Sequence, residues 1–283
     1  AFGLWDKKER KLNLVRDKFG EKPLFYSFYN NSLIFSSELK VFEIFKKDLK
    51  INLESVQDYL NLSYIPSPNT IYENIFKLDP GSLLTLDLKM FSNKYSNGFY
   101  NIRKNNYLKY ETYWNVLSNN SSIDKKRSFL DYKNIIQLKL EGSVKDKMIS
   151  DVPIGVFLSG GVDSSLIASI MKKYSIDKIN TFTISSKNSN FDESKKASEI
   201  SKYLNSNHHS LEVSNNDQLD IVDQLSSIYD EPFADSSQIP SIILSKYTKN
   251  YVKVALTGDG ADEVFFRWWC RFCDAWRNVC WSR

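Results

Sequence analysis

The chain has 283 residues, of which 42% are hydrophobic and 25% charged, and its formal net charge is +4. This composition is ordinary for a globular protein and argues against a disordered or fibrous class. Lysines are mixed with acidic residues, as in residues 6–11, so we expect no nucleic-acid-binding face. No apolar run of about eighteen residues and no signal peptide is visible, and no cysteine precedes Cys270, so we expect no membrane span and a cytoplasmic location.

The first hundred residues predict a β-rich region. Short apolar stretches of strand type, joined by polar turns, cover residues 1–6, 12–17, 24–28, 33–36 and 82–88. Residues 53–65 predict a helix that Pro66 and Pro68 end.

The next part of the chain predicts a linker followed by an α/β domain. Residues 119–122 are Asn and Ser, a composition typical of a linker, so a boundary is expected near residue 122. A helix from Ser128 to Ile149 follows. The pattern then alternates as a parallel sheet requires. The expected strands are residues 153–158, 179–184, 209–213 and 252–257, and the expected helices are residues 166–174, 192–205 with Asp192 as N-cap, 219–228 and 239–247.

Residues 159–165 (SGGVDSS) lie between a predicted strand and a predicted helix. Two adjacent glycines let backbone N–H groups approach an anion, and Ser164 and Ser165 add hydroxyl groups. Asp163 would repel a phosphate unless Mg²⁺ lay between them, so we interpret it as an ion ligand. The lysine of a Walker A loop is absent. The alternative is a glycine-rich turn without a ligand.

A second loop, residues 258–263 (GDGADE), follows the last predicted strand. Ligands of open α/β sheets bind beyond the carboxyl ends of the strands, so the two loops are expected to face one pocket. An acidic turn is the alternative for this loop.

These two loops carry a family resemblance. Residues 159–164 resemble the SGGxDS pyrophosphate loop of the N-type ATP pyrophosphatases, which split ATP to AMP and pyrophosphate. Together with residues 257–263 they are similar to the synthetase domain of the glutamine-hydrolysing asparagine synthetases. Residues 1–26 and 33–40 resemble the last part of the glutaminase domain of that family.

The resemblance implies an α/β fold with two partial domains. Residues 123–266 are expected to form a parallel-sheet, adenine nucleotide α-hydrolase-like (Rossmann-like) domain, and residues 1–122 the remnant of a β-rich N-terminal-nucleophile glutaminase domain with a linker. Residue 1 is alanine, whereas that glutaminase uses an N-terminal cysteine. We therefore expect the chain to start inside the glutaminase domain and not to hydrolyse glutamine by that route.

The implied reaction is ATP-dependent amide synthesis. A carboxylate, most simply that of aspartate, attacks the α-phosphorus of ATP, and ammonia, free or from glutamine, then displaces AMP. The resemblance implies ATP and Mg²⁺ as cofactors, with Mg²⁺ held by Asp163 and Asp262. Asp259 matches an acidic residue proposed to deprotonate the ammonia. The matched nucleotide-binding positions are Leu158, Ser159, Gly160, Gly161, Asp163, Ser164, Ser165, Ile184, Thr257 and Gly258.

Several alternatives stay open at this stage. Residues 230–237 resemble the family segment that borders the acceptor pocket, but a capped interhelical loop is the alternative for Asp230 and Glu231. Members of the family also amidate sugar acids or close lactams, and they are often homodimers. A pyrophosphatase acting on a nucleotide or tRNA fits less well, because residues 1–40 resemble the glutaminase.

The last seventeen residues, 267–283, differ in composition from the rest. All three cysteines and four of the six tryptophans follow Arg267, so we interpret this stretch as an aberrant tail, with a frameshift as the hypothesis. Cys270 and Cys273 have zinc-knuckle spacing but no second pair, so no metal site is expected there. The Trp-rich tail and the missing half-domain favour a catalytically inactive fragment as the rival interpretation.

Overall fold

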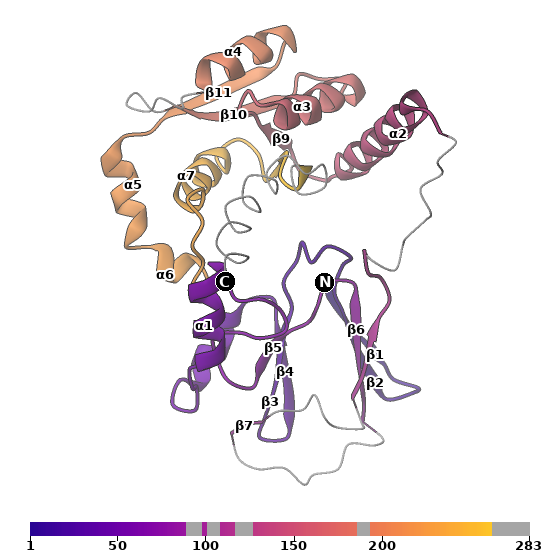
Figure 1. Cartoon of the computed structure of the whole chain (residues 1–283), viewed down its shortest axis with the longest axis vertical. Helices are drawn as coiled ribbons and strands as arrows, with labels where there is room; N and C mark the ends of the chain where they lie inside the picture. The colour runs from indigo at the N-terminus through magenta and orange to yellow at the C-terminus, as the bar shows by residue number, and fades with distance from the viewer. Residues whose placement is uncertain (89–97, 101–107, 117–126, 186–192, 262–283) are drawn as a thin grey trace, which may run out of the picture. The chain divides into compact units, whose positions relative to one another are not determined.

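A computed structural model describes residues 1–88, 98–100, 108–116, 127–185 and 193–261 (Figure 1). The chain divides into two compact units. Unit 1 comprises residues 1–123 and 224–236, and unit 2 comprises residues 124–223 and 237–283.

Unit 1 is mostly antiparallel β-structure. Its strands are β1 (Phe2–Asp6), β2 (Lys11–Val15), β3 (Phe25–Tyr29), β4 (Ser32–Ser36), β5 (Ile75–Lys77), β6 (Ser82–Asp87), β7 (Phe99–Tyr100) and β8 (Leu108–Thr112). In the part of the chain that the structure describes, one sheet has the order β1-β2-β6-β8, and a second has the order β4-β3-β5, with β7 also paired to β3. The β-rich region predicted from the sequence is confirmed.

The core of unit 1 follows from the alternation of its strands. In β6 the buried residues Ser82, Leu84 and Leu86 alternate with half-buried ones, because successive side chains of a strand point to opposite faces. Leu84 and Leu86 pack in one cluster with Leu14 and Phe28, which are fully buried. Two short helical segments, η1 (Leu39–Phe45) and α1 (Leu53–Leu62), lie between β4 and β5 in the sequence of this unit.

Unit 2 alternates strands and helices along a parallel sheet. Its strands are β9 (Ile154–Phe157), β10 (Asn180–Ser185), β11 (Asn207–Glu212) and β12 (Val254–Leu256). Its helices are α2 (Phe129–Lys147), α3 (Val162–Tyr174), α4 (Ser194–Tyr203), α5 (Asn215–Val222) and α7 (Gln238–Thr248), whereas α6 (Leu225–Ile228) belongs to unit 1. The predicted parallel-sheet α/β fold is confirmed.

The strand order of unit 2 contains a reversal. The sheet runs β11-β10-β9-β12, and all three neighbouring pairs are parallel. From β9 the chain steps outward to β10 and β11, and it then returns to place β12 on the other side of β9. Such a reversal is the point at which open α/β sheets bind their ligands, outside the carboxyl ends of the strands.

Helices cover the parallel sheet, and the two middle residues of β9, Gly155 and Val156, are buried. Helix α3 contacts β9, and α4 contacts β10 and β11. Val156 and Ala168 are fully buried in the core of this unit. Only glycine fits at position 155, because an added Cβ would lie 2.5 Å from Cε2 of Phe182, whose ring fills that space.

The structure corrects three details of the sequence prediction. Helix α1 ends at Leu62, where Ser63 adopts a left-handed φ of 67°, so the helix stops before the prolines. The single helix predicted over residues 219–228 is two helices, α5 and α6. The N-cap of α4 is Glu193, and Asp192 lies outside the described residues. The strands β5, β7 and β8 were not predicted, because each is short and lacks a clear apolar alternation.

No helix in the described ranges is long and apolar enough to cross a membrane. Among the described helices of unit 2 the longest is α2, and polar contacts hold it to α3. The Glu141 carboxylate accepts hydrogen bonds from Nζ of Lys173 at 2.8 and 2.9 Å, from Oη of Tyr174 at 2.6 Å and from Nε2 of Gln137 at 2.9 Å. These hydrogen bonds lower the pKa of Glu141 to about 2, and the bond from Lys173 contributes most.

We predict that Glu141→Gln lowers the stability of unit 2 at neutral pH. In the folded protein the pKa of Glu141 lies below its ordinary value of 4.5. The carboxylate therefore stabilises the fold at pH values above 4.5, and this stabilisation is lost as the pH falls toward about 2. Urea unfolding at pH 7 and at pH 3 measures the effect. The gap between wild type and variant is expected to narrow at pH 3, and Glu199→Gln, on the exposed side of α4, is the control. An equal gap at both pH values contradicts the prediction.

Candidate functional site

The loop between β9 and α3 has the backbone of an anion-binding turn. Gly160 adopts a left-handed φ of +82°, which a residue with a Cβ rarely adopts. Gly161 is the N-cap of α3, and no side chain caps this helix start. The N–H groups of the first helical turn have no partner within the helix, so a helix that begins in this way suits a negatively charged ligand.

Serine hydroxyl groups hold the loop in this shape. The N–H of Ser159 donates to Oγ of Ser164 at 3.2 Å, and the two serine Oγ atoms lie 2.9 Å apart. The N–H of Gly161 donates to Oγ of Ser159 at 3.2 Å, and Oγ of Ser165 donates to the carbonyl of Gly161 at 2.5 Å. The hydroxyl groups therefore form hydrogen bonds within the loop, and these bonds fix the conformation of its backbone.

Strand β10 supports the start of the loop. The N–H of Leu158 donates to the carbonyl of Phe182 at 2.8 Å, and Oγ1 of Thr183 donates to the carbonyl of Leu158. Leu158 is only 1% exposed and belongs to the core, whereas Ile184, near the carboxyl end of β10, is half-buried. Of these two predicted nucleotide-binding positions, only Ile184 has a side chain that solvent reaches.

Gly160 also permits a close approach of α4. A Cβ at this position would lie 2.8 Å from Cβ of Lys196 and 3.0 Å from the backbone nitrogen of Ala197. Thr183, Lys196 and Ala197 are supporting residues that no sequence motif predicts. Nothing in the local pattern marks them, because each supports the loop from an element that is distant in the sequence.

The second predicted loop lies directly against the first. Residues 257–260 follow β12, and Gly258 sits beside the start of α3. An added Cβ at Gly258 would lie 2.9 Å from the backbone nitrogen of Ser164 and 3.1 Å from Cβ of Asp163. Only glycine allows this contact without a shift of the backbone. The structure thus brings the two loops together at the strand reversal.

The carboxylates of the site differ in exposure. Asp259 is exposed, and its N–H donates to Oγ1 of Thr257, also exposed, at 3.3 Å. Asp163, in the first turn of α3, is half-buried, and Asp262 lies outside the described residues. Within those residues no three His, Cys, Asp or Glu side chains form a metal cluster. A Mg²⁺ ion needs only one or two carboxylates when phosphate oxygens supply further ligands, so Asp163 fits that role.

Asp230 and Glu231, the possible acceptor-pocket residues, lie in residues 224–236 of unit 1. Their carboxylates are engaged there with Leu39, Ile71 and Lys77, all of the same unit. The structure favours the interpretation of this segment as a structural loop, because both carboxylates bind groups of the protein itself.

Family models match two regions of the chain, one within unit 1 and one that covers most of unit 2 together with residues 224–236 of unit 1. The family model described as Asparagine synthase matches residues 136–277, and the model described as Glutamine amidotransferase domain matches residues 1–96. The first of these reaches from α2 through both loops of the site.

Individual relatives match almost the whole chain. A Methanocaldococcus jannaschii protein named as asparagine synthetase (glutamine-hydrolysing) 2 is 37% identical over 94% of this chain and 48% of its own length. Asparagine synthetase (glutamine-hydrolysing) 1 of Bacillus subtilis is 31% identical over 94% of this chain and 39% of its own length. The chain therefore spans half or less of the length of these relatives. An NMN synthetase structure from Francisella tularensis aligns with a TM-score of 0.35 at 19% identity, over 46% of this chain and 56% of that one.

We predict that Gly258→Ala separates the two loops. The new Cβ meets backbone atoms of Asp163 and Ser164, which cannot move without shifting the start of α3, so a destabilisation of about 1–3 kcal/mol is expected. Urea unfolding and faster hydrogen exchange at the Ser164 amide measure it. Gly142→Ala is the matched control, because a Cβ there meets nothing within 4 Å and alanine favours a helix. Unchanged stability and exchange in Gly258→Ala contradict the account.

Proposed function

This chain belongs to the asparagine synthase family, and we propose that unit 2 binds ATP and catalyses ATP-dependent formation of an amide from a carboxylate. The carboxylate is aspartate in the simplest case, and ammonia, free or released from glutamine, supplies the nitrogen. A sugar acid is the alternative acceptor. The amidotransferase region, residues 1–96, is the proposed source of the ammonia in the whole protein.

One observation carries this proposal. The loops that follow β9 and β12 are in van der Waals contact at the strand reversal of a parallel sheet, and one of them opens α3 without a side-chain cap. Helix α3 directs its positive end toward that loop, and the two glycines leave the backbone accessible. A polyphosphate is the ligand class that suits such a site best.

Loop residues are assigned to pyrophosphate, the leaving group. In the proposed complex Ser159, Gly160, Gly161 and Ser164 hold the β- and γ-phosphates. Residues 159–164 resemble a pyrophosphate loop and lack the Walker A lysine, so in this proposal the outer phosphates are bound as the unit that leaves, and the α-phosphorus is open to attack. Asp163 would hold Mg²⁺, which would neutralise phosphate charge when bound.

The proposed reaction proceeds in two steps. An oxygen of the acceptor carboxylate forms a bond to the α-phosphorus, and pyrophosphate leaves with the electrons of the broken P–O bond. Ammonia then attacks the acyl carbon, AMP leaves, and the nitrogen loses a proton. Asp259 is the proposed proton acceptor, because it is exposed and directly follows Gly258, which lies against Asp163 and Ser164.

We predict that Asp163→Asn lowers pyrophosphate release from ATP, in the presence of aspartate and ammonium, by about 10²-fold or more, because the site then lacks its ion-binding carboxylate. Using ammonium as the nitrogen donor makes the assay independent of glutamine hydrolysis. Asp177→Asn, at an exposed turn after α3, is the control and is expected to retain full activity. Absence of pyrophosphate release from the wild-type chain would overturn the proposed function and favour an inactive fragment.

A second prediction separates the two steps. Replacing Asp259 with asparagine is expected to lower amide formation by about 10²–10⁴-fold, because the proton acceptor is lost. Exchange of labelled pyrophosphate into ATP, measured with aspartate but without ammonia, should persist. Asp259→Glu keeps the carboxylate and should recover part of the amide-forming rate. An equal loss in both assays would mean that Asp259 acts in the first step instead.

A further inference from the structure

Residues 224–236, here called the strap, leave the sequence of unit 2 and join unit 1. Helix α5 precedes the strap and helix α7 follows it, and both belong to unit 2. The strap itself contains α6 and the acidic pair Asp230 and Glu231. Its membership of unit 1 therefore has to come from specific contacts with residues far away in the sequence.

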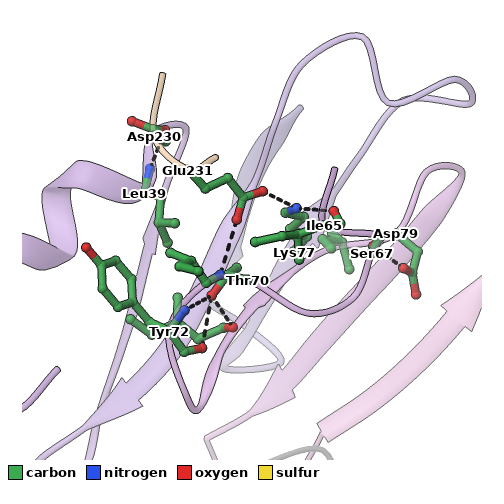
Figure 2. A network of polar contacts seen from close by, with 12 residues as sticks. Leu39, Ile65, Ser67, Thr70, Tyr72, Lys77, Asp79, Asp230 and Glu231 are labelled. Atoms are coloured by element: carbon green, nitrogen blue, oxygen red, sulfur yellow. Dashed lines mark hydrogen bonds and ion pairs between the residues drawn. The ribbon is translucent and has the colours of Figure 1, made fainter. Parts of the chain in front are cut away.

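Asp230 supplies the first of these contacts (Figure 2). Its Oδ2 accepts a hydrogen bond from the backbone N–H of Leu39 at 2.6 Å, and its Oδ1 lies 3.6 Å from Nζ of Lys40. Nζ of Lys40 also donates to the carbonyl of Ser227 at 3.2 Å. Asp230 thus caps the start of η1, and Lys40 contacts the strap at two points.

Glu231 supplies the second contact, from the neighbouring position of the strap (Figure 2). One carboxylate oxygen accepts from the backbone N–H of Ile71 at 3.2 Å, and the other forms an ion pair with Nζ of Lys77 on β5. Nζ of Lys77 also donates to the carbonyl of Ile65 at 2.6 Å. The side chains of Lys77 and Glu231 are only 14% and 16% exposed, so this ion pair is largely removed from water.

A buried ion pair of this kind fixes geometry more than it adds stability. Burial raises the pKa of Glu231 above its ordinary value, although Lys77 and the Ile71 amide act in the opposite direction. The desolvation of the carboxylate therefore outweighs the attraction of its partners. Removing only one partner leaves a buried charge unpaired, which costs more than removing both.

A further hydrogen bond fastens the strap after the acidic pair. The N–H of Ala234 donates to the carbonyl of Ser63 at 2.9 Å, directly after the end of α1. Within the strap, the rings of Tyr229 and Phe233 pack with their centroids 5.7 Å apart. The strap is therefore attached to unit 1 at its middle and near its end, just before α7 begins at Gln238.

We propose that Asp230 and Glu231 are positioning residues that clamp the strap to the amidotransferase region and, through α7 and β12, hold the loop of residues 257–260 against α3. The proposal rests on the proposed function only for its catalytic consequence. The chain continues from the strap through α7 and β12 into Gly258, the residue in contact with Asp163 and Ser164. Lys77, outside the synthase family match, then affects the nucleotide site.

The geometry distinguishes this role from direct binding of the acceptor. Both oxygens of Glu231 and one oxygen of Asp230 already have protein partners within unit 1. If Glu231 bound the acceptor instead, Glu231→Gln would raise the KM for aspartate, and Lys77→Met would not. If Glu231 positions the strap, the two substitutions act alike, because either one breaks the same ion pair.

Hydrogen exchange of the full chain tests the clamp without any need for activity. Lys77→Met and Glu231→Gln are each expected to speed exchange by about tenfold in residues 224–236 and, in parallel, in residues 257–260. The double variant removes both buried charges and should return part of the protection. Lys109→Met removes an exposed ion pair with Glu111 on β8 of the same unit and should change neither segment. Circular dichroism checks that each variant is folded.

The outcomes separate this inference from the proposed function. Faster exchange confined to the strap, with residues 257–260 unchanged, would overturn the inference, as would unchanged exchange in both segments. Where the wild-type chain releases pyrophosphate, both single variants should lower kcat by about tenfold with the KM for aspartate nearly unchanged. A KM increase in Glu231→Gln alone would also overturn it. An inactive wild-type chain would refute the proposed function, while the exchange data would still decide the clamp.

Discussion

The contact between Gly258 and the start of α3 is the constraint on which the candidate site depends. It joins two loops that are almost a hundred positions apart in the sequence, and it leaves no room for a Cβ. The contact exists because β12 returns to the free side of β9 and ends at the same edge of the sheet. The strand order therefore creates the site, and the serine hydroxyl bonds around Gly161 fix its shape.

The loop after β9 is also held from the other side. Thr183 of β10 donates to the Leu158 carbonyl, α4 approaches Gly160, and Glu141 fixes the far end of α3 through Lys173. These contacts hold the loop and α3 in place, so that the backbone N–H groups of the loop keep a fixed orientation. Such preorganisation would favour the proposed binding of phosphate, because the dipoles would then not need to reorganise during the proposed reaction.

Local patterns in the sequence predicted β9, the glycine loop and α3, because an apolar strand, paired glycines and helical spacing occur in one continuous stretch. The sequence could not predict that Glu231 meets Lys77, because no periodicity links two positions so far apart. The predicted end of α1 was wrong because Ser63 adopts a left-handed conformation, which ends the helix before the prolines are reached. Elements and loops were thus predictable, whereas their supporting contacts were not. The roles of Asp163 and Asp259 remain predictions.

The identity of the nucleotide product tests the central claim most directly. If the lysine-free loop binds the outer phosphates as a leaving unit, incubation of the chain with ATP, Mg²⁺, aspartate and ammonium yields AMP and pyrophosphate in equal amounts. Chromatography of the nucleotides together with phosphorus NMR measures both products. Formation of ADP and inorganic phosphate would contradict the account, because the bond broken would then be the outer one.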